Sequence, residues 1–427
     1  MLASLLLVFP GLLVLGTTPS VQAHRRHDLT GRHKAAHSLH ERLLVNSLDT
    51  PVDVTGKHAF QPPREGDQRG PCPGLNALAN HGYISRDGIA SLTEAITAIN
   101  TVYGMGIELA TILAVMGVVW AGAPLSLDPS FSIGSNDTAV QNLLGGVLGI
   151  LGTPQGLDYS HNLIESDSSP TRDDLYVTGD AWTMNLTNFE NLYSMVPEGQ
   201  PFTSEIMATF AARRMNESIA TNPNFYFGPF TGFIARNAGY LFILRLFANH
   251  SAEHPDGQLT HETLKSFFGV TGSGSNLTYQ KGWERIPENF YKVPLDWGLV
   301  QFNLDLVSWT LQYPQLASIG GNLGSVNSFA GVDLSDPVGG LLNLSNLLEG
   351  NNLLCFALQI VKLAAPSYTN NVFATLTKPL TLILDALAAP ILSLSCPSWD
   401  ALTEGGEDWL SGLQQKFPGA NKTTVAL

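Results

Sequence analysis

The chain has few charged residues, and among them basic side chains are scarce. Only 14% of its 427 residues are charged, and 36 acidic against 22 basic side chains give a formal net charge of −14. This balance argues against nucleic acid or an anionic membrane surface as a partner. With 44% hydrophobic residues, the chain can still bury one large core or two moderate ones, so we expect a globular protein.

Cysteine is also scarce, which excludes a disulfide-dense scaffold. The three cysteines are Cys72, Cys355 and Cys396. Residues 1–23 have an apolar core and a Val-Gln-Ala ending, and they predict a secretory signal peptide although the usual basic start is missing. In the oxidising compartment that export implies, Cys355 and Cys396 pair most economically with each other, which leaves Cys72 odd.

Two further features agree with a secreted, extracellular protein. Residues 24–68 lack an apolar period and are rich in histidine and arginine, so they predict a propeptide or disordered arm; the histidine spacing matches no metal-ligand pattern. Acceptor sites for N-glycans are numerous. They lie at Asn136, Asn185, Asn216, Asn249, Asn276, Asn343 and Asn421.

Helix signals dominate the rest of the chain. Ser91 and Glu94 form a capping box, and residues 107–120 are almost continuously apolar but too short for a comfortable membrane span. No strand alternation or internal repeat competes with this pattern. We predict a mainly α fold, a single compact domain over residues 69–418 and a flexible tail at 419–427. Further helices are predicted at 203–218, 239–248, 260–268, 300–312, 353–364 and 375–389.

The odd cysteine lies at the predicted start of a helix. Pro71 and Pro73 flank Cys72, and a helix-like run follows up to a His81-Gly82 stop. Proline suits the first helical position, which places Cys72 at or beside the N-cap. There, backbone amides and the helix dipole favour the thiolate, the form that ligates metals. From these residues alone, a buried structural cysteine at a turn is the alternative.

A second group of reactive side chains lies in residues 161–174. Ser169 followed by Pro170 has the pattern of an N-cap and first helical residue, and acidic residues after it would suit the helix dipole. Capping does not explain Glu165 and Asp167. Their carboxylates, with a nearby hydroxyl, supply the hard oxygen ligands that magnesium or calcium prefers.

Together these segments resemble a known family. Residues 69–82 and the Glu165-Ser166-Asp167 motif are similar to those of the fungal haem-thiolate peroxidases, which include chloroperoxidase and the unspecific or aromatic peroxygenases. Residues 220–225, 320–324 and 327–329 resemble the same family, so the similarity covers nearly the whole chain after the arm. The resemblance implies a single helical haem-binding domain of the chloroperoxidase type.

The resemblance also implies a set of site residues. Cys72, between Pro71 and Pro73, would be the axial ligand of the iron in haem b, and its thiolate would favour O–O cleavage of hydrogen peroxide. Glu165, the carbonyl of Ser166 and the side chain of Ser169 would hold Mg²⁺ against a haem propionate. A disulfide between Cys355 and Cys396 matches the C-terminal cysteine pair of the longer peroxygenases.

The chain departs from the family where a proton must move between the peroxide oxygens. Short members carry histidine where this chain has Ser166, and long members carry an arginine and a glutamate where it has Thr231 and Ala238. Because it follows a sequon asparagine, His250 is expected to face solvent. The candidate substitutes are Arg236, Asn237, His250 and Glu253.

Three functions follow from these observations. The first is a secreted haem-thiolate peroxidase or peroxygenase that uses hydrogen peroxide to oxidise, hydroxylate or halogenate small apolar or aromatic compounds in secondary metabolism. The second is a haem-binding ligand carrier on the same scaffold, with little turnover because the usual distal residues are missing. The third is a helical protein without a cofactor, in which Cys72 is merely structural.

Overall fold

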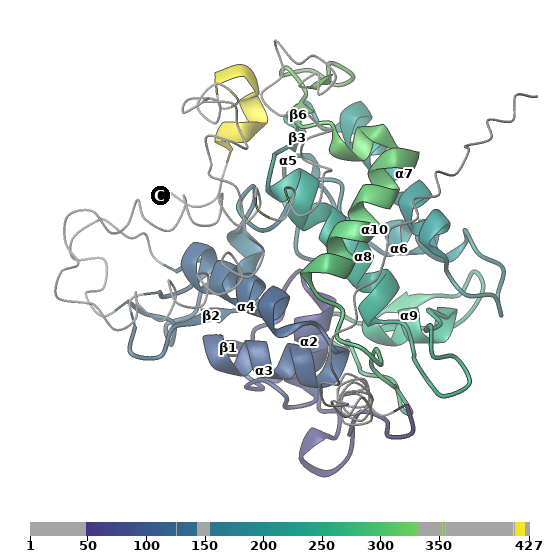
Figure 1. Ribbon diagram of the computed structural model, residues 1–427. Coiled ribbons are helices and arrows are strands. Elements are labelled where there is room, and N and C mark those ends of the chain that lie inside the picture. The colour runs from purple at the N-terminus through teal and green to yellow at the C-terminus, as the bar shows by residue number, and fades with distance from the viewer. Residues whose placement is uncertain are drawn as a thin grey trace, which may run out of the picture. The chain divides into compact units, whose positions relative to one another are not determined.

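The computed structural model describes residues 48–124, 126–142, 154–331, 352, 355, 413 and 415–422. Within these residues the fold is mainly α, as predicted (Figure 1). The α-helices are α2 (Pro73–Asn80), α3 (Leu92–Tyr103), α4 (Ile107–Met116), α5 (Leu175–Thr178), α6 (Leu186–Tyr193), α7 (Ser204–Thr221), α8 (Asn237–Leu246), α9 (His261–Phe267) and α10 (Leu299–Gln312).

The helix boundaries follow from local capping. Ser91 accepts a hydrogen bond from the amide of Glu94 and starts α3, and Gly104 ends this helix with a φ of 69°, a left-handed conformation that favours glycine. Thr203 and Thr260 cap α7 and α9 in the same way. The sequence therefore placed these helices to within a few residues. The helices predicted at 353–364 and 375–389 lie outside the described residues, apart from Cys355.

Two local predictions were wrong. Ser169 and Pro170 do not begin a helix, because α5 starts only at Leu175 with Asp174 as its N-cap residue. Short strands were missed, since two or three residues are too few to show an alternating pattern. They pair antiparallel as β1 (Ile89–Ser91) with β2 (Ser130–Ser132), β6 (Gly320–Gly321) with both β3 (Tyr226–Phe227) and β7 (Ala330–Gly331), and β4 (Val270–Thr271) with β5 (Thr278–Tyr279).

The helices pack in two sets around buried aromatic and aliphatic side chains. In Figure 1, α2, α3 and α4 gather in purple and blue, and α3 contacts both of the others. The second set has α8 against α7 and α10. Each set also contains a π-helical segment: η2 (Gly117–Ala121) directly follows α4, and η4 (Thr231–Arg236) directly precedes α8. Such segments often occur at functional sites, and both contribute to the cavity described below.

Both ends of the expected domain need correction. Residues 48–68 do not form a loose arm, because the Val52 amide bonds to Phe290, the Gln61 amide bonds to Asn80, and the ring of His58 stacks on Tyr83. At the other end, residues 418–421 form the 3₁₀ turn η7, against the tail expected from residue 419. Residues 1–47 and 423–427 lie outside the described residues, so the signal peptide stays a prediction.

No helix among the described residues is long and apolar enough to cross a membrane. The strongly apolar segment that begins at Ile107 instead forms α4 and η2, whose side chains are mostly buried in the core. The interpretation of this segment as a core helix is therefore confirmed.

Candidate functional site

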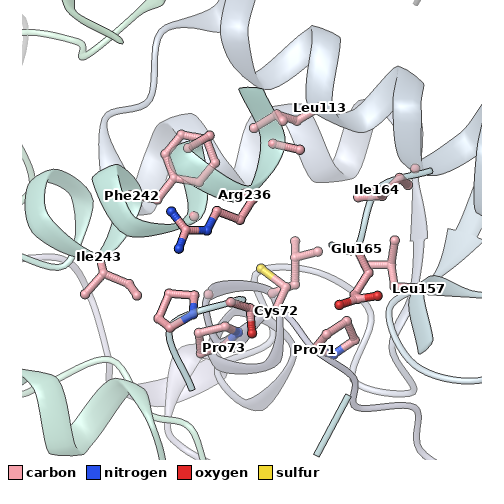
Figure 2. Close-up of a pocket in the computed structure, with 18 of the residues that line it drawn as sticks. Pro71, Cys72, Pro73, Leu113, Leu157, Ile164, Glu165, Arg236, Phe242 and Ile243 are labelled. Carbon is pink, nitrogen blue, oxygen red and sulfur yellow. The ribbon is translucent and has the colours of Figure 1, made fainter. Parts of the chain in front are cut away.

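A cavity of about 300 Å³ opens where the two helix sets meet the loop at residues 157–172. Its volume is within the range of small-molecule and cofactor sites. Figure 2 shows Cys72 between Pro71 and Pro73 on one wall, with Leu113 and Phe242 across from it. Most of the lining is apolar. Polar or titratable side chains enter it from Cys72, Tyr103, Ser160, Glu165, Ser166, Ser169, Thr171, Arg172 and Arg236.

Cys72 is the N-cap residue of α2, as predicted. Its backbone is extended, its carbonyl accepts the Asn76 amide at 3.1 Å, and Pro73 is the first helical residue. The backbone amides favour the thiolate as expected, but burial has a larger effect on the pKa of the thiol. Burial raises the pKa of the Cys72 thiol, and the amides of Leu75 and Gly74 with the charge of Arg172 only oppose that rise. Coordination to a metal cation would deprotonate the thiol outright.

Asn76 holds the loop that carries Cys72. Its side-chain oxygen accepts the Gly70 amide, and its side-chain nitrogen donates to the Gly70 carbonyl and to Glu284 Oε1, each at 3.0 Å. Glu284 is almost fully buried, and its other oxygen has no partner. Burial raises the pKa of Glu284. Through Asn76, the loop that carries Cys72 is therefore linked to Glu284, a residue far away in the sequence.

Two more residues of the same motif fix α2. The Asn80 side chain donates to the carbonyls of Gly282 and Glu284 and accepts from Arg69. One ring nitrogen of His81 lies 2.7 Å from the carbonyl of His58, and the other accepts the Ile286 amide. Asn80 and His81, which do not line the described cavity, thus anchor α2.

Glu165 brings a carboxylate to the cavity wall. Its Oε2 lies 2.5 Å from His161 Nδ1, while its Oε1 and the Ser166 hydroxyl are buried without a hydrogen-bond partner. Although burial lowers the pKa of His161, the charges of Glu165 and Asp167 raise it to about 9. Glu165 Oε1 is thus an unpaired donor atom of the type a hard cation binds.

The other acidic residues of this loop have different roles. Asp167 is fully buried and is not among the described residues that line the cavity; burial and the charge of Asp174 raise its pKa well above the usual range. Asp174 accepts hydrogen bonds from the Ser168 amide, Ser218 and Asn222. It therefore ties the loop to α7 and does not cap α5 with its side chain.

The four candidates for the residue that moves a proton between the peroxide oxygens differ in where they lie and in what they contact. Arg236 lines the cavity, but its guanidinium donates to the Ser168 carbonyl and hydroxyl and to Ala211. Asn237 is buried away from the described cavity wall and donates to Phe233 and Leu316. His250 was expected in solvent but is buried, and the carbonyls of Pro255 and Arg245 lie within hydrogen-bond distance of its ring. Glu253 is exposed.

Sequence reasoning missed three residues near the site. Arg172 lines the cavity, His161 supports Glu165, and Glu284 accepts from Asn76. The first two stand in a motif noted for its carboxylates, so a signal existed. No local pattern marks Glu284, which reaches the site only through the packing of a distant loop. Cys355 is buried, whereas Cys396 lies outside the described residues, so their disulfide stays a prediction.

The residues present fit a haem-like group. The cavity offers apolar walls for a macrocycle, a sulfur for an axial ligand, and an unpaired carboxylate oxygen beside two serines. Within the described part of the chain, no three His, Cys, Asp or Glu side chains converge on a point suited to a metal ion. A cation at Glu165 would therefore need serine or backbone oxygens and oxygens of a bound group to complete its shell.

Comparison with known proteins agrees with this site. The model of peroxidase family 2 matches residues 58–294. The chain is 55% identical over 390 residues to the aromatic peroxidase fscJ of Fusarium equiseti, which covers 91% of this chain and 89% of that protein. It is 41% identical over 377 residues to the dothistromin biosynthesis peroxidase dotB of Dothistroma septosporum, covering 87% and 86%.

A more distant relative carries a second activity in its name. The chain is 33% identical over 234 residues to an aromatic peroxygenase of Coprinellus radians, covering 53% of this chain and 80% of that protein. The family match, the relatives and the helical fold agree with one another. The chain therefore belongs to peroxidase family 2, the fungal haem-thiolate peroxidases and peroxygenases, and is a haem enzyme of that class.

Proposed function

We propose that this protein is a secreted enzyme in which Cys72 ligates the iron of haem b, and which uses hydrogen peroxide to oxidise, hydroxylate or halogenate small apolar or aromatic compounds. The observation that carries the proposal is the position of Cys72 in the wall of an apolar cavity, at the start of α2. When bound, a thiolate-ligated haem supplies the electron push that cleaves the O–O bond. The chain's residues hold and orient it.

The proximal residues keep the sulfur in one place. Pro71 and Pro73 restrict the backbone on either side of Cys72, and Asn76 clamps Gly70. The backbone amides of Gly74 and Leu75 favour the charged sulfur. These groups stabilise a thiolate without supplying it with a proton, because amide protons do not transfer at neutral pH.

We further propose that Glu165, the Ser166 carbonyl and Ser169 bind Mg²⁺ beside a haem propionate. The unpaired Oε1 of Glu165 supports this assignment. The hydroxyl of Ser169 accepts the Arg172 amide at 3.1 Å, which leaves a further lone pair for a cation. His161 holds the other Glu165 oxygen and so fixes the carboxylate at the wall.

The lining supports an apolar substrate. Leu113, Met116, Phe242, Ile243 and Leu246 line the cavity with apolar side chains. A role in secondary metabolism is supported by the relative named for dothistromin biosynthesis. Among the distal candidates, Arg236 alone lines the cavity, but its guanidinium is already hydrogen-bonded to Ser168 and Ala211, so we propose that it supports the cavity wall more than it moves a proton near peroxide.

The purified holoprotein tests this function directly. We expect a thiolate-type spectrum of the reduced carbon monoxide complex, and rapid oxidation of a phenolic dye or oxygen insertion into an aromatic substrate on mixing with peroxide. Cys72→Ala should abolish the thiolate spectrum, and Cys72→His should replace it with an imidazole-type spectrum. An unchanged carbon monoxide spectrum in both variants would contradict the assignment of Cys72.

The haem carrier is the second candidate, and one observation favours it. Glu165 is the single carboxylate among the described residues that line the cavity, and the guanidinium of Arg236 is already hydrogen-bonded. A carrier with a thiolate spectrum would be bleached slowly by peroxide without oxidising the dye or the aromatic compound. The same mixing experiment therefore separates the two functions.

A further inference from the structure

Arg172 is a buried cation in the cavity wall whose hydrogen bonds are incomplete. Its side chain lines the cavity, and the residue is only 4% exposed. Nη1 donates to the Thr171 hydroxyl at 2.6 Å, whereas Nε has no partner. None of the ion pairs among the described residues includes Arg172.

The backbone of Arg172 is held in place, so this arrangement is not a loose surface contact. Its amide donates to the Ser169 hydroxyl, and its carbonyl accepts from Arg214 Nη2 at 3.1 Å and from Asn188. It also forms a bridge to Met184. Arg172 thus lines the cavity from a fixed backbone, as a binding residue requires.

No described carboxylate neutralises this cation. The charge of Arg172 acts on both Glu284 and Asp158: burial raises the pKa of Glu284 and so disfavours its charged form, whereas Asp158, whose pKa burial raises to about 6, stays mostly charged at neutral pH. Neither carboxylate forms an ion pair with it. A buried charge without a counter-ion costs several kcal/mol, so an anion is expected to complete the site when the cavity is filled.

The surroundings indicate which anion. Arg172 and Cys72 line the same cavity, the charge of Arg172 acts on the Cys72 thiol, and the guanidinium carbon of Arg172 lies 5.8 Å from the ring centre of Phe268, which also lines the cavity. A porphyrin bound to Cys72 would occupy the cavity that Arg172 lines, and its propionates would be its anionic groups. The group that a cation here can reach is therefore a carboxylate on the porphyrin rim.

We propose that Arg172 binds a propionate carboxylate of the haem, through the planar fork of donors that suits a carboxylate. The inference rests on the proposed ligation by Cys72. The chain would then bind the haem propionates at two places, through the cation at Glu165 and through the guanidinium of Arg172. Arg172 is thus a cofactor-binding residue.

The test compares haem loss from holoproteins into excess apomyoglobin. We expect Arg172→Gln to lose haem about tenfold faster or more, because a charge-assisted hydrogen bond contributes about 1.5–3 kcal/mol. Arg172→Lys should lie between wild type and Arg172→Gln, since it keeps the charge but not the fork. Arg245→Gln is the matched control, because Arg245 pairs with Asp305 and does not line the described cavity, and it should behave as wild type.

A second measurement separates binding from a structural effect. Loss of a cation near the iron should lower the Fe(III)/Fe(II) reduction potential in Arg172→Gln and leave it near the wild-type value in Arg172→Lys. If Arg172→Gln yields no holoprotein, Thr171→Val removes only the contact to Nη1 and should speed haem loss two- to threefold. If the variant loses haem at the wild-type rate and keeps its thiolate spectrum, this inference is overturned and the proposed function is not affected. If the wild-type protein itself lacks a thiolate spectrum, the proposed function fails.

Discussion

Asn76 Nδ2 donates a hydrogen bond to Glu284 Oε1 at 3.0 Å, although the two residues are 208 positions apart. Asn76 lies on α2, one turn after Cys72, and Glu284 comes from the loop between β5 and α10. This contact joins the cysteine loop to the second half of the chain. It predicts that the two partners respond differently to substitution.

We expect Asn76→Ala to lower the free energy of unfolding by about 2–3 kcal/mol, because the Gly70 amide and carbonyl and Glu284 all lose a buried partner. Glu284→Gln should change it by less than about 1 kcal/mol, because the amide oxygen still accepts from Asn76 and burial already disfavours the charged carboxylate. Urea unfolding of both variants is the measurement. Equal destabilisation by the two substitutions would show that Glu284 acts as a charge.

His81 predicts acid sensitivity. Burial lowers the pKa of His81 to about 4, below its unfolded value of about 6.5. The unfolded chain therefore binds this proton first, so the contribution of neutral His81 is complete above pH 6.5 and declines as the pH falls towards 4. The decline is on the order of 3 kcal/mol.

Urea unfolding between pH 7 and pH 4 measures this decline, with His81→Gln as the reference because it does not titrate. The stability of the wild type should fall more steeply than that of His81→Gln over this range. Parallel curves for the two proteins would mean that folding does not shift the pKa of His81.

The proposed magnesium site predicts a selective loss of metal. Glu165→Gln should reduce bound magnesium from about one per haem to near zero while the thiolate spectrum persists, because the amide lacks the charge that holds the cation. Asp173→Asn is the matched control, since Asp173 is occupied by Asn185 and Asn188 and does not line the described cavity. Elemental analysis of both holoproteins is the measurement. Equal magnesium in both variants would remove Glu165 from the site.

Arg236 predicts a loss of stability larger than its loss of rate. Arg236→Gln removes the hydrogen bonds that the guanidinium donates to the Ser168 and Ala211 carbonyls, and it removes the contact of the guanidinium with the Tyr240 ring. The free energy of unfolding should therefore fall by about 3 kcal/mol. The reaction of the folded holoprotein with peroxide, followed by stopped flow, should slow by less than about tenfold. A slowing of about 100-fold or more would identify Arg236 as the group that moves the proton.

Glycosylation depends on the exposure of each sequon. Asn136, Asn216, Asn276 and Asn421 are exposed, and we expect glycans on them when the protein is expressed through a secretory pathway. The side chains of Asn185 and Asn249 donate to Asp173 and Asn289, so we expect low occupancy at both positions. Glycopeptide mass spectrometry measures the occupancy of each site. Full occupancy of Asn185 would require its hydrogen bonds to Asp173 to break.

Local signals were sufficient for the helices and for Cys72. The caps of α3, α7 and α9 are hydrogen bonds between residues three positions apart, so a short sequence window contains both partners. The same holds for the proline that follows Cys72. The boundaries of the domain were less predictable, because residues 48–68 and 418–421 are ordered by contacts with distant residues such as Phe290 and Asn162.

The candidate site could be predicted only in part. The sequence motifs contained Cys72 and Glu165, and the structure brings both to one cavity. Exposure was harder to judge: His250 is buried among backbone carbonyls although it adjoins a sequon, because a polar ring can be buried when a carbonyl accepts its N–H. The role of a polar residue therefore depended on its neighbours in space.

The sequence by itself determined the helical class, the capped helix starts and the place of the odd cysteine beside α2, because each depends on interactions between neighbours in the chain. Only the tertiary structure decided that Glu284 supports the cysteine loop, that Arg172 lies unpaired in the cavity wall, and that Asn237 is buried away from it. Those properties depend on burial and on partners up to some two hundred residues away, which no local pattern encodes.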